Sequence, residues 1–163
     1  MQFAKDTFLI ALQQRLAEIN PQRTTTLGAA TMPAVVATEN QPHTATALLP
    51  EVFYLSWGTA GIAAGGENAV CPLMKMEAQI SYSACGSDAG ADRGQRLGAL
   101  DTELLRMCAP ASITKCEYGK TPAVILSTSV FWGEPKLDTI VDKNGLISRN
   151  AQVEVFFFPE VRL

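Results

Sequence analysis

Residues 75–108 carry the sequence KMEAQISYSACGSDAGADRGQRLGALDTELLRMC, which predicts a strand, a turn and a helix in succession. Apolar and polar side chains alternate in the first part, and this period of two is typical of a strand with one buried face. The apolar positions are Met76, Ala78, Ile80, Tyr82 and Ala84. In the last part the apolar residues recur every three or four positions, which marks one face of a helix. These positions are Leu97, Leu100, Leu104 and Met107.

The turn between the two elements reads GSDAGAD (86–92). Asp92 is the predicted N-cap, with Gln95 at the third helical position as in a capping box. Asp88 would lie near the positive end of the helix. A cation loop containing Ser87, Asp88 and Asp92 is the alternative, but an EF-hand loop needs about six spaced oxygen ligands ending in Glu. The pattern therefore favours helix capping.

The predicted helix also carries charges of both signs away from its apolar face, and Cys108-Ala109-Pro110 ends it. Such a mixed face is typical of a solvated surface, and it is also a candidate contact with a neighbouring subunit. The charged residues are Arg93, Arg96, Asp101, Glu103 and Arg106.

The first part of the chain predicts a helix over residues 3–19, which ends at Asn20-Pro21 because the residue before proline disfavours helical geometry. Its apolar stripe consists of Phe8, Leu9, Leu12, Leu16 and Ile19. A polar connector, PQRTTTLGAAT (21–31), precedes a short strand at Ala34–Thr38.

The middle of the chain contains one further strand and two loops. Residues 41–50 are irregular and hold His43, the only histidine, which we expect to be solvated. Val52–Trp57 has aromatic residues on both faces, which predicts a strand that is buried on both sides or covered by a partner. Residues 58–72, GTAGIAAGGENAVCP, match neither G-x-x-x-x-G-K-[ST] nor G-x-G-x-x-G, so a phosphate loop is disfavoured. Gly58–Pro72 is instead predicted to be a loop that is flexible or ordered by a partner.

The last third predicts a connector at Ala111–Pro122, then strands at Val124–Trp132, Lys136–Val141 and Leu146–Phe158. Asn144-Gly145 is a tight-turn signal between the last two strands. Together, these elements predict one α+β domain over residues 1–163. It should hold a mostly antiparallel sheet of about five to six strands, with two main helices packed on one face.

Composition limits the function classes. The chain has 163 residues, 47% of them apolar and 18% charged, with a net charge of −3. No run of Lys or Arg supports direct nucleic-acid binding, and no apolar stretch approaches the length of a membrane span. The N-terminal segment has too short an apolar run for a signal peptide, so we expect synthesis and folding in a cytoplasm. The low charge suits a surface buried against other subunits, or equally a monomer rich in Ala, Ser and Thr.

The residues that usually carry catalysis or metal binding are sparse. G-x-S-x-G and H-E-x-x-H are absent, and Asp101 and Glu103 point apart because they are two positions apart on a helix. The four cysteines have no C-x-x-C spacing, so free thiols are favoured over a zinc site or a Cys108–Cys116 disulfide. These cysteines are Cys71, Cys85, Cys108 and Cys116. We therefore predict a protein that is not an enzyme, with no catalytic, cofactor-binding or metal-binding residues and no cofactor.

Four segments in this order resemble the tail terminator family of tailed bacteriophages and prophages, also called minor tail or tail-completion proteins. They are Met32-Pro33-Ala34-Val35-Val36, Met76–Ala84, Leu100-Asp101-Thr102-Glu103-Leu104-Leu105 and Val153-Glu154-Val155-Phe156-Phe157-Phe158. The resemblance covers most of the chain, although the segment between Thr38 and Met76 is longer than in the short form of the family.

The resemblance implies a structural protein that forms a homo-oligomeric ring, typically a hexamer. Such a ring caps the completed tail tube and contacts the neck proteins, so the chain would reside in the bacterial cytoplasm during assembly and then in the virion tail. Gly58–Pro72 and Ala111–Pro122 are then the candidate contact loops. A head–tail joining (neck) protein and a small ligand-binding or enzymatic α+β domain, with a pocket holding His43, remain the alternatives.

Overall fold

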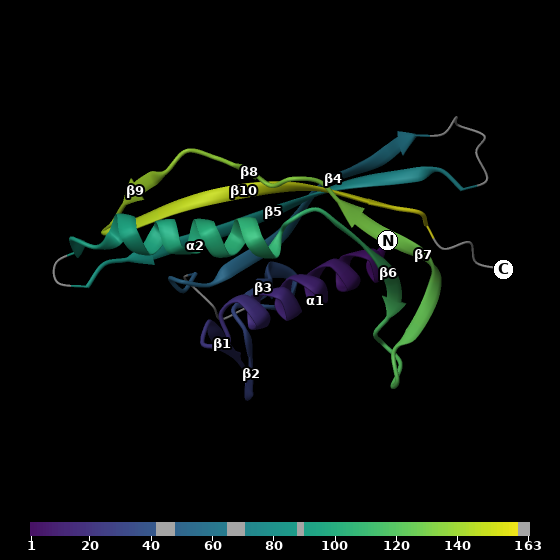
Figure 1. Ribbon diagram of the computed structural model, residues 1–163, viewed down its shortest axis with the longest axis horizontal. Helices are drawn as coiled ribbons and strands as arrows, with labels where there is room; N and C mark the ends of the chain where they lie inside the picture. Colours follow the sequence, from purple (N-terminus) through teal and green to yellow (C-terminus); the bar gives the residue numbers. More distant parts are fainter. Residues whose placement is uncertain (42–47, 65–70, 88–89, 160–163) are drawn as a thin grey trace.

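The computed structural model describes residues 1–41, 48–64, 71–87 and 90–159. It contains two α-helices, a short 3-10 helix and ten strands within these ranges (Figure 1). The helices are α1 (Gln2–Ile19), η1 (Thr38–Asn40) and α2 (Arg93–Met107). The strands are β1 (Thr24–Leu27), β2 (Ala30–Pro33), β3 (Val35–Ala37), β4 (Phe53–Ala64), β5 (Leu73–Cys85), β6 (Ala111–Glu117), β7 (Val124–Trp132), β8 (Lys136–Leu137), β9 (Val141–Lys143) and β10 (Leu146–Phe157).

Eight of the strands form one sheet, in the order β3-β4-β5-β10-β7-β6, with β8 and β9 paired to β10. The pairing is antiparallel throughout except between β3 and β4. The predicted α+β class and mostly antiparallel sheet are therefore confirmed. The predicted number of strands is too low, because β6 lies where a connector is predicted and the predicted strand at Lys136–Val141 forms two short strands.

The strand–turn–helix unit over residues 75–108 forms the centre of the molecule. All five alternating apolar residues of β5 are buried, and so are the four predicted core residues of α2. β5 lies between β4 and β10, and it pairs with β4 through residues 73–81 and with β10 through residues 74–85. The sequence pattern therefore correctly predicts both the elements and their buried faces.

Both helices cover the same face of the sheet, as Figure 1 shows. The ring of Phe8 on α1 makes edge contacts with Trp57 and Trp132, at centroid distances of 5.7 and 5.0 Å. Trp57 pairs across the sheet with an inward residue of β5, and Trp132 pairs with an inward residue of β10. The same inward face packs against α2, so one core joins both helices to the sheet.

The segment predicted as a polar connector, residues 21–31, instead contributes to a separate hairpin, β1–β2. Leu27 pairs with Ala30 across the turn, and Gly28 adopts the positive φ of 62° that such a turn requires. The side chains of both strands are exposed or only half-buried. Without a buried face there is no alternation of apolar residues, so a strand signal is absent from the sequence.

Two predicted loops are wrong in part, because their first halves are strands. β4 does not end at Trp57 but continues to Ala64, so 58–64 belong to the sheet. Residues 65–70 of that predicted loop, like His43 and Asp88, lie outside the described residues. Residues 111–117 form β6, which pairs with β7. The turn at Asn144-Gly145 is confirmed, with φ of 54° and 77° at these two residues.

Candidate functional site

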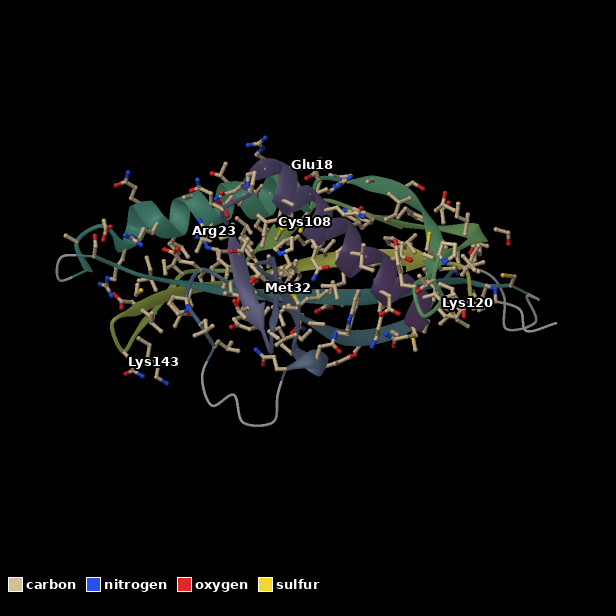
Figure 2. All side chains as sticks on the ribbon, turned by 90° about the horizontal axis from the view of Figure 1, so that it is seen from below. Glu18, Arg23, Met32, Cys108, Lys120 and Lys143 are labelled. Atoms are coloured by element: carbon tan, nitrogen blue, oxygen red, sulfur yellow. The ribbon has the colours of Figure 1, made fainter. Side chains whose placement is uncertain are left out.

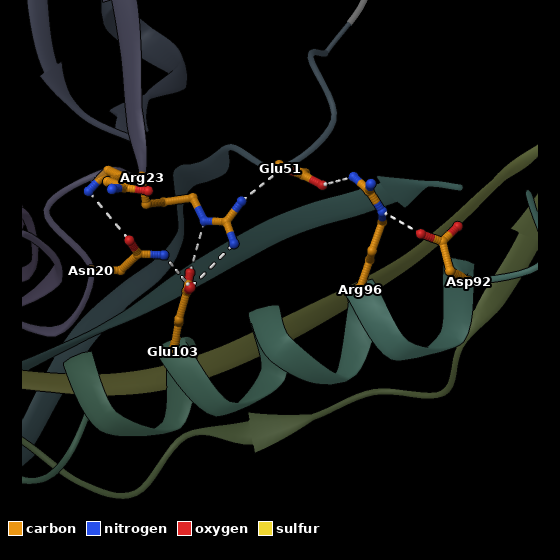
Figure 3. Close-up of polar contacts among 7 residues, drawn as sticks. Asn20, Arg23, Glu51, Asp92, Arg96 and Glu103 are labelled. Atoms are coloured by element: carbon orange, nitrogen blue, oxygen red, sulfur yellow. Dashed lines mark hydrogen bonds and ion pairs between the residues drawn. The ribbon is translucent and has the colours of Figure 1, made fainter. Parts of the chain in front are cut away.

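The best-connected polar cluster links the end of α1, the segment before β4 and the outer side of α2 (Figure 3). Glu103 accepts hydrogen bonds from Asn20 Nδ2 at 2.7 Å and from Arg23 Nε and Nη2 at 2.9 and 3.1 Å. Arg23 also pairs with Glu51, whose second oxygen accepts a bond from Arg96 Nη1 at 2.9 Å. Two arginines and two glutamates thus alternate along a chain of ion pairs.

The network continues to the start of α2. Arg96 Nε donates to Asp92 at 2.8 Å, and the backbone amide and hydroxyl of Ser87 donate to the same carboxylate. The bond from Arg96, followed by those from Ser87, lowers the pKa of Asp92 to about 2. Although burial opposes the charged form of Arg23, its contacts with Glu103 and Glu51 raise the pKa of its guanidinium. Each charged group in the cluster has at least one partner of opposite charge, and these ion pairs connect the three segments.

Asp92 is the residue before α2, as predicted, but it does not cap the helix through its side chain. Its carboxylate turns instead toward Ser87 and Arg96. The predicted capping box therefore does not form. Arg96, one turn along the helix, binds the Asp92 carboxylate that would otherwise accept hydrogen bonds from the first backbone amides of α2.

A second cluster joins α2 to the sheet. Asp101 accepts a hydrogen bond from the Tyr82 hydroxyl at 2.6 Å and pairs with Arg149 Nη1 at 2.7 Å. Burial, followed by the bond to Asp101, raises the pKa of Tyr82 well above its ordinary value. A tyrosine held in its neutral form by a carboxylate is a structural contact and a poor general base.

These contacts show that most of the charged face of α2, predicted to be a solvated surface, is bonded within the chain, while its predicted role as a subunit contact stays a prediction. Four of its five residues form ion pairs within the chain, and Glu103 is buried. The fifth, Arg106, is exposed and forms no ion pair with the described residues. The sequence could not reveal these pairings, because the partners come from β9, β10 and the segments before β1 and β4.

Two of the shallow cavities lie against the sheet. One, of about 230 Å³, is lined by Leu48, Tyr54, Ser81, Tyr82, Ser83, Ser148 and Asn150. The other, of about 220 Å³, is lined by Glu77, Gly133, Glu134, Lys136, Gln152 and Glu154. The first brings serine hydroxyls together without a histidine, lysine or carboxylate among these lining residues to activate them. In the second, Glu154 is paired with Lys75 at 2.9 Å, which lowers the pKa of Glu154.

Metal ligands do not gather anywhere in the described part of the chain, where no three His, Cys, Asp or Glu side chains are placed to hold an ion. The four cysteines are free thiols, with Cys71 and Cys85 exposed and Cys108 buried. Figure 2 places Cys108 near the middle of the molecule, while Lys120 and Lys143 lie toward its ends. Over the same described ranges, no helix is long and apolar enough to cross a membrane.

Two of the most exposed apolar side chains lie on β-ribbons that leave the body of the molecule in different directions (Figure 1). One ribbon consists of the C-terminal half of β4 and the N-terminal part of β5, and Ile62 on this ribbon is 55% exposed. The other consists of β6 and β7 and exposes Ile125 by 74%. The two ribbons overlap the predicted contact segments Gly58–Pro72 and Ala111–Pro122, although they are strands and not loops.

Comparison with known proteins adds no assignment: no protein-family model matches the chain, and no curated protein matches it significantly.

Proposed function

We propose that this chain is a structural protein of a bacteriophage or prophage tail, which assembles as a homo-oligomeric ring on the end of the tail tube and contacts the neck. The proposal combines the sequence resemblance to tail terminator proteins with the two projecting ribbons. A hexamer is the expected ring, and the chain acts without a catalytic residue, metal or cofactor.

The ribbons carry the structural part of the proposal. A ring needs two different surfaces on each subunit, so that each copy contacts the next head to tail. Ile62 is an exposed apolar side chain on one ribbon, and Val124 and Ile125 are exposed neighbours on the other, so each ribbon offers apolar surface that a subunit contact would bury. Most charged side chains of α2 already form ion pairs within the chain, so we expect them to contribute little to the contacts between subunits.

The test is the mass of the purified chain, measured by sedimentation velocity over a hundredfold range of concentration, with and without tail tubes. The tubes are assembled from the tail-tube protein that the proposal expects to be encoded beside this chain. We expect a discrete oligomer that sediments with the tubes and is located at tube ends by electron microscopy. A chain that stays monomeric at the highest concentration, and that ignores the tubes, would contradict the proposal.

A neck protein would give a different result in the same experiment. Such a ring would form without tubes but would be retained on portal or connector complexes. The genes beside this one provide an independent check, since tube, sheath or tape-measure genes are expected there.

A further inference from the structure

The outer edge of β4 is largely bare. β3 pairs with β4 only through Phe53–Leu55. Beyond these residues, no described strand pairs with the same edge of β4, which continues through 56–64. The short helix η1, which follows β3, contacts β4 without pairing with it, so the most exposed part of this edge is its C-terminal half. This stretch reads SWGTAGIAA, with no charge and no proline. Natural sheets usually protect long edge strands with lysine, proline or a covering element, so an uncharged bare edge indicates a partner strand.

The two outermost strands of the sheet are protected, and the same helix protects both. Gln13 of α1 donates to the carbonyl of Val35 on β3 at 2.9 Å. Thr7 of α1 accepts a bond from the amide of Cys116 on β6 at 3.0 Å. Side chains of α1 therefore bond the backbone of both outermost strands, whereas residues 58–64 of β4 are exposed.

β7 has a second bare edge. It pairs with β6 along its length but with β10 only through Val130–Trp132. Residues 124–129 read VILSTS, again without charge, and no other described strand pairs with their free side. The ribbons that carry the two edges diverge in Figure 1, so one copy does not join its own two edges.

We infer that the bare edge of β4, residues 56–64, pairs with the bare edge of β7, residues 124–129, in a second copy of this chain. The β4 edge, residues 56–64, is long enough to pair with all of the shorter β7 edge, residues 124–129, and both lack charge. A contact between different surfaces can also repeat from copy to copy until a ring closes. Because it names the contact within the ring, this inference rests on the proposed function.

The register shows which amides of β4 would make the contact. Phe53 donates its amide to Ala34 on the β3 side, and alternate residues of an antiparallel ladder direct their amides the same way. Leu55 and Trp57 are in this phase, and they pair with inward residues of β5. A register shift between Trp57 and Ala60 places one extra residue in β4, so beyond it the even-numbered residues are in this phase. Ile62 is one of these, and it pairs with the inward residue Met74. Ile62 therefore directs its amide to the bare edge, whereas Gly61 directs its own toward β5.

This alternation allows a backbone-specific test. Ile62→Pro removes an amide that faces the edge and leaves the β4–β5 ladder intact, a position that tolerates proline. Ile62→Thr is the matched control, because it also loses the apolar side chain but keeps the amide and the β-branched shape. We expect Ile62→Pro to sediment as a monomer with a wild-type circular dichroism spectrum, and Ile62→Thr to remain oligomeric.

Cross-linking identifies the partner edge. In a background where the three accessible cysteines are replaced by serine, Ala60→Cys and Ser127→Cys chains are prepared separately, mixed and treated with a short bismaleimide. We expect a cross-linked dimer that needs both chains. An Ala60→Cys chain that cross-links only to itself would overturn the inference in favour of a two-fold β4–β4 contact.

The outcomes separate the two proposals. If Ile62→Pro keeps the wild-type oligomer mass, the edge contact is wrong while the ring stands. If the wild-type chain is monomeric, with no response to tail tubes, the ring is wrong and the edge contact with it.

Discussion

Replacing Glu103 with alanine should destabilise the protein by about 3 kcal/mol, because it removes the acceptor of three hydrogen bonds. The side chains of Glu103 and Arg23 are only 12% and 16% exposed, so water replaces the lost contacts poorly. Removing one partner of a buried ion pair costs about 3–5 kcal/mol. The low end applies here because Arg23 keeps its 2.8 Å contact with Glu51.

The assay is urea unfolding at one fixed protein concentration, since oligomerisation alters apparent stability. At this chain length, a loss of about 3 kcal/mol lowers the melting temperature by about 9 °C. Glu18→Ala is the control, because Glu18 lies on α1 outside the network. If Glu103→Ala is no less stable than Glu18→Ala at an unchanged m-value, the claim that this ion-pair network stabilises the fold is refuted.

Asp92, Cys108 and two glycines provide the remaining tests. Because the folded pKa of Asp92 is about 2, below its ordinary 3.8, its contribution to stability is present above about pH 4 and is lost toward pH 2. Asp92→Asn should therefore flatten the acid limb of stability measured by urea unfolding against pH. Burial raises the pKa of the Cys108 thiol to about 12, so mass spectrometry after alkylation at pH 8 should find Cys108 unmodified until urea unfolds the chain. Gly98→Ala, in an open helical position, should raise stability by about 0.5–1 kcal/mol, whereas Gly145→Ala, at a φ of 77°, should lower it by about 1 kcal/mol in thermal melts. Equal shifts for the two glycine variants would contradict the backbone argument.

The sequence predicts those elements whose buried face is apolar and regular. β5, β10 and both helices are found because most of their core residues are apolar and recur with one period. β7 is found to the residue, at Val124–Trp132. In these segments, local pattern and tertiary burial agree.

Sequence patterns fail to predict a strand where a polar residue is buried in it or where glycines interrupt its apolar residues. β6 is missed because its most buried residue is Lys115, which is fully buried and donates a hydrogen bond to the carbonyl of Phe158. A lysine at this position breaks the apolar alternation that marks a strand. The distal half of β4 is missed because Gly58 and Gly61 indicate a loop in isolation, whereas pairing with β5 holds them in the sheet.

The candidate site is predicted least well, because it depends on residues far apart in the chain. The sequence places Arg96 and Glu103 on a charged helix face but cannot show that Glu51 and Arg23 come to meet them. The two bare edges are likewise visible only once the length of each strand pairing is known. The segments proposed from the resemblance as partner contacts do contain part of one of these edges, at 58–64, whereas residues 111–117 pair with the opposite edge of β7.

The mass of the native assembly tests the central claim most directly. Native mass spectrometry of the 17.5 kDa chain, across a concentration series, should show one closed oligomer, a hexamer by the resemblance, with little between it and the monomer. A chain that remains a monomer at every concentration, even with tail tubes present, would contradict the claim that it forms a ring.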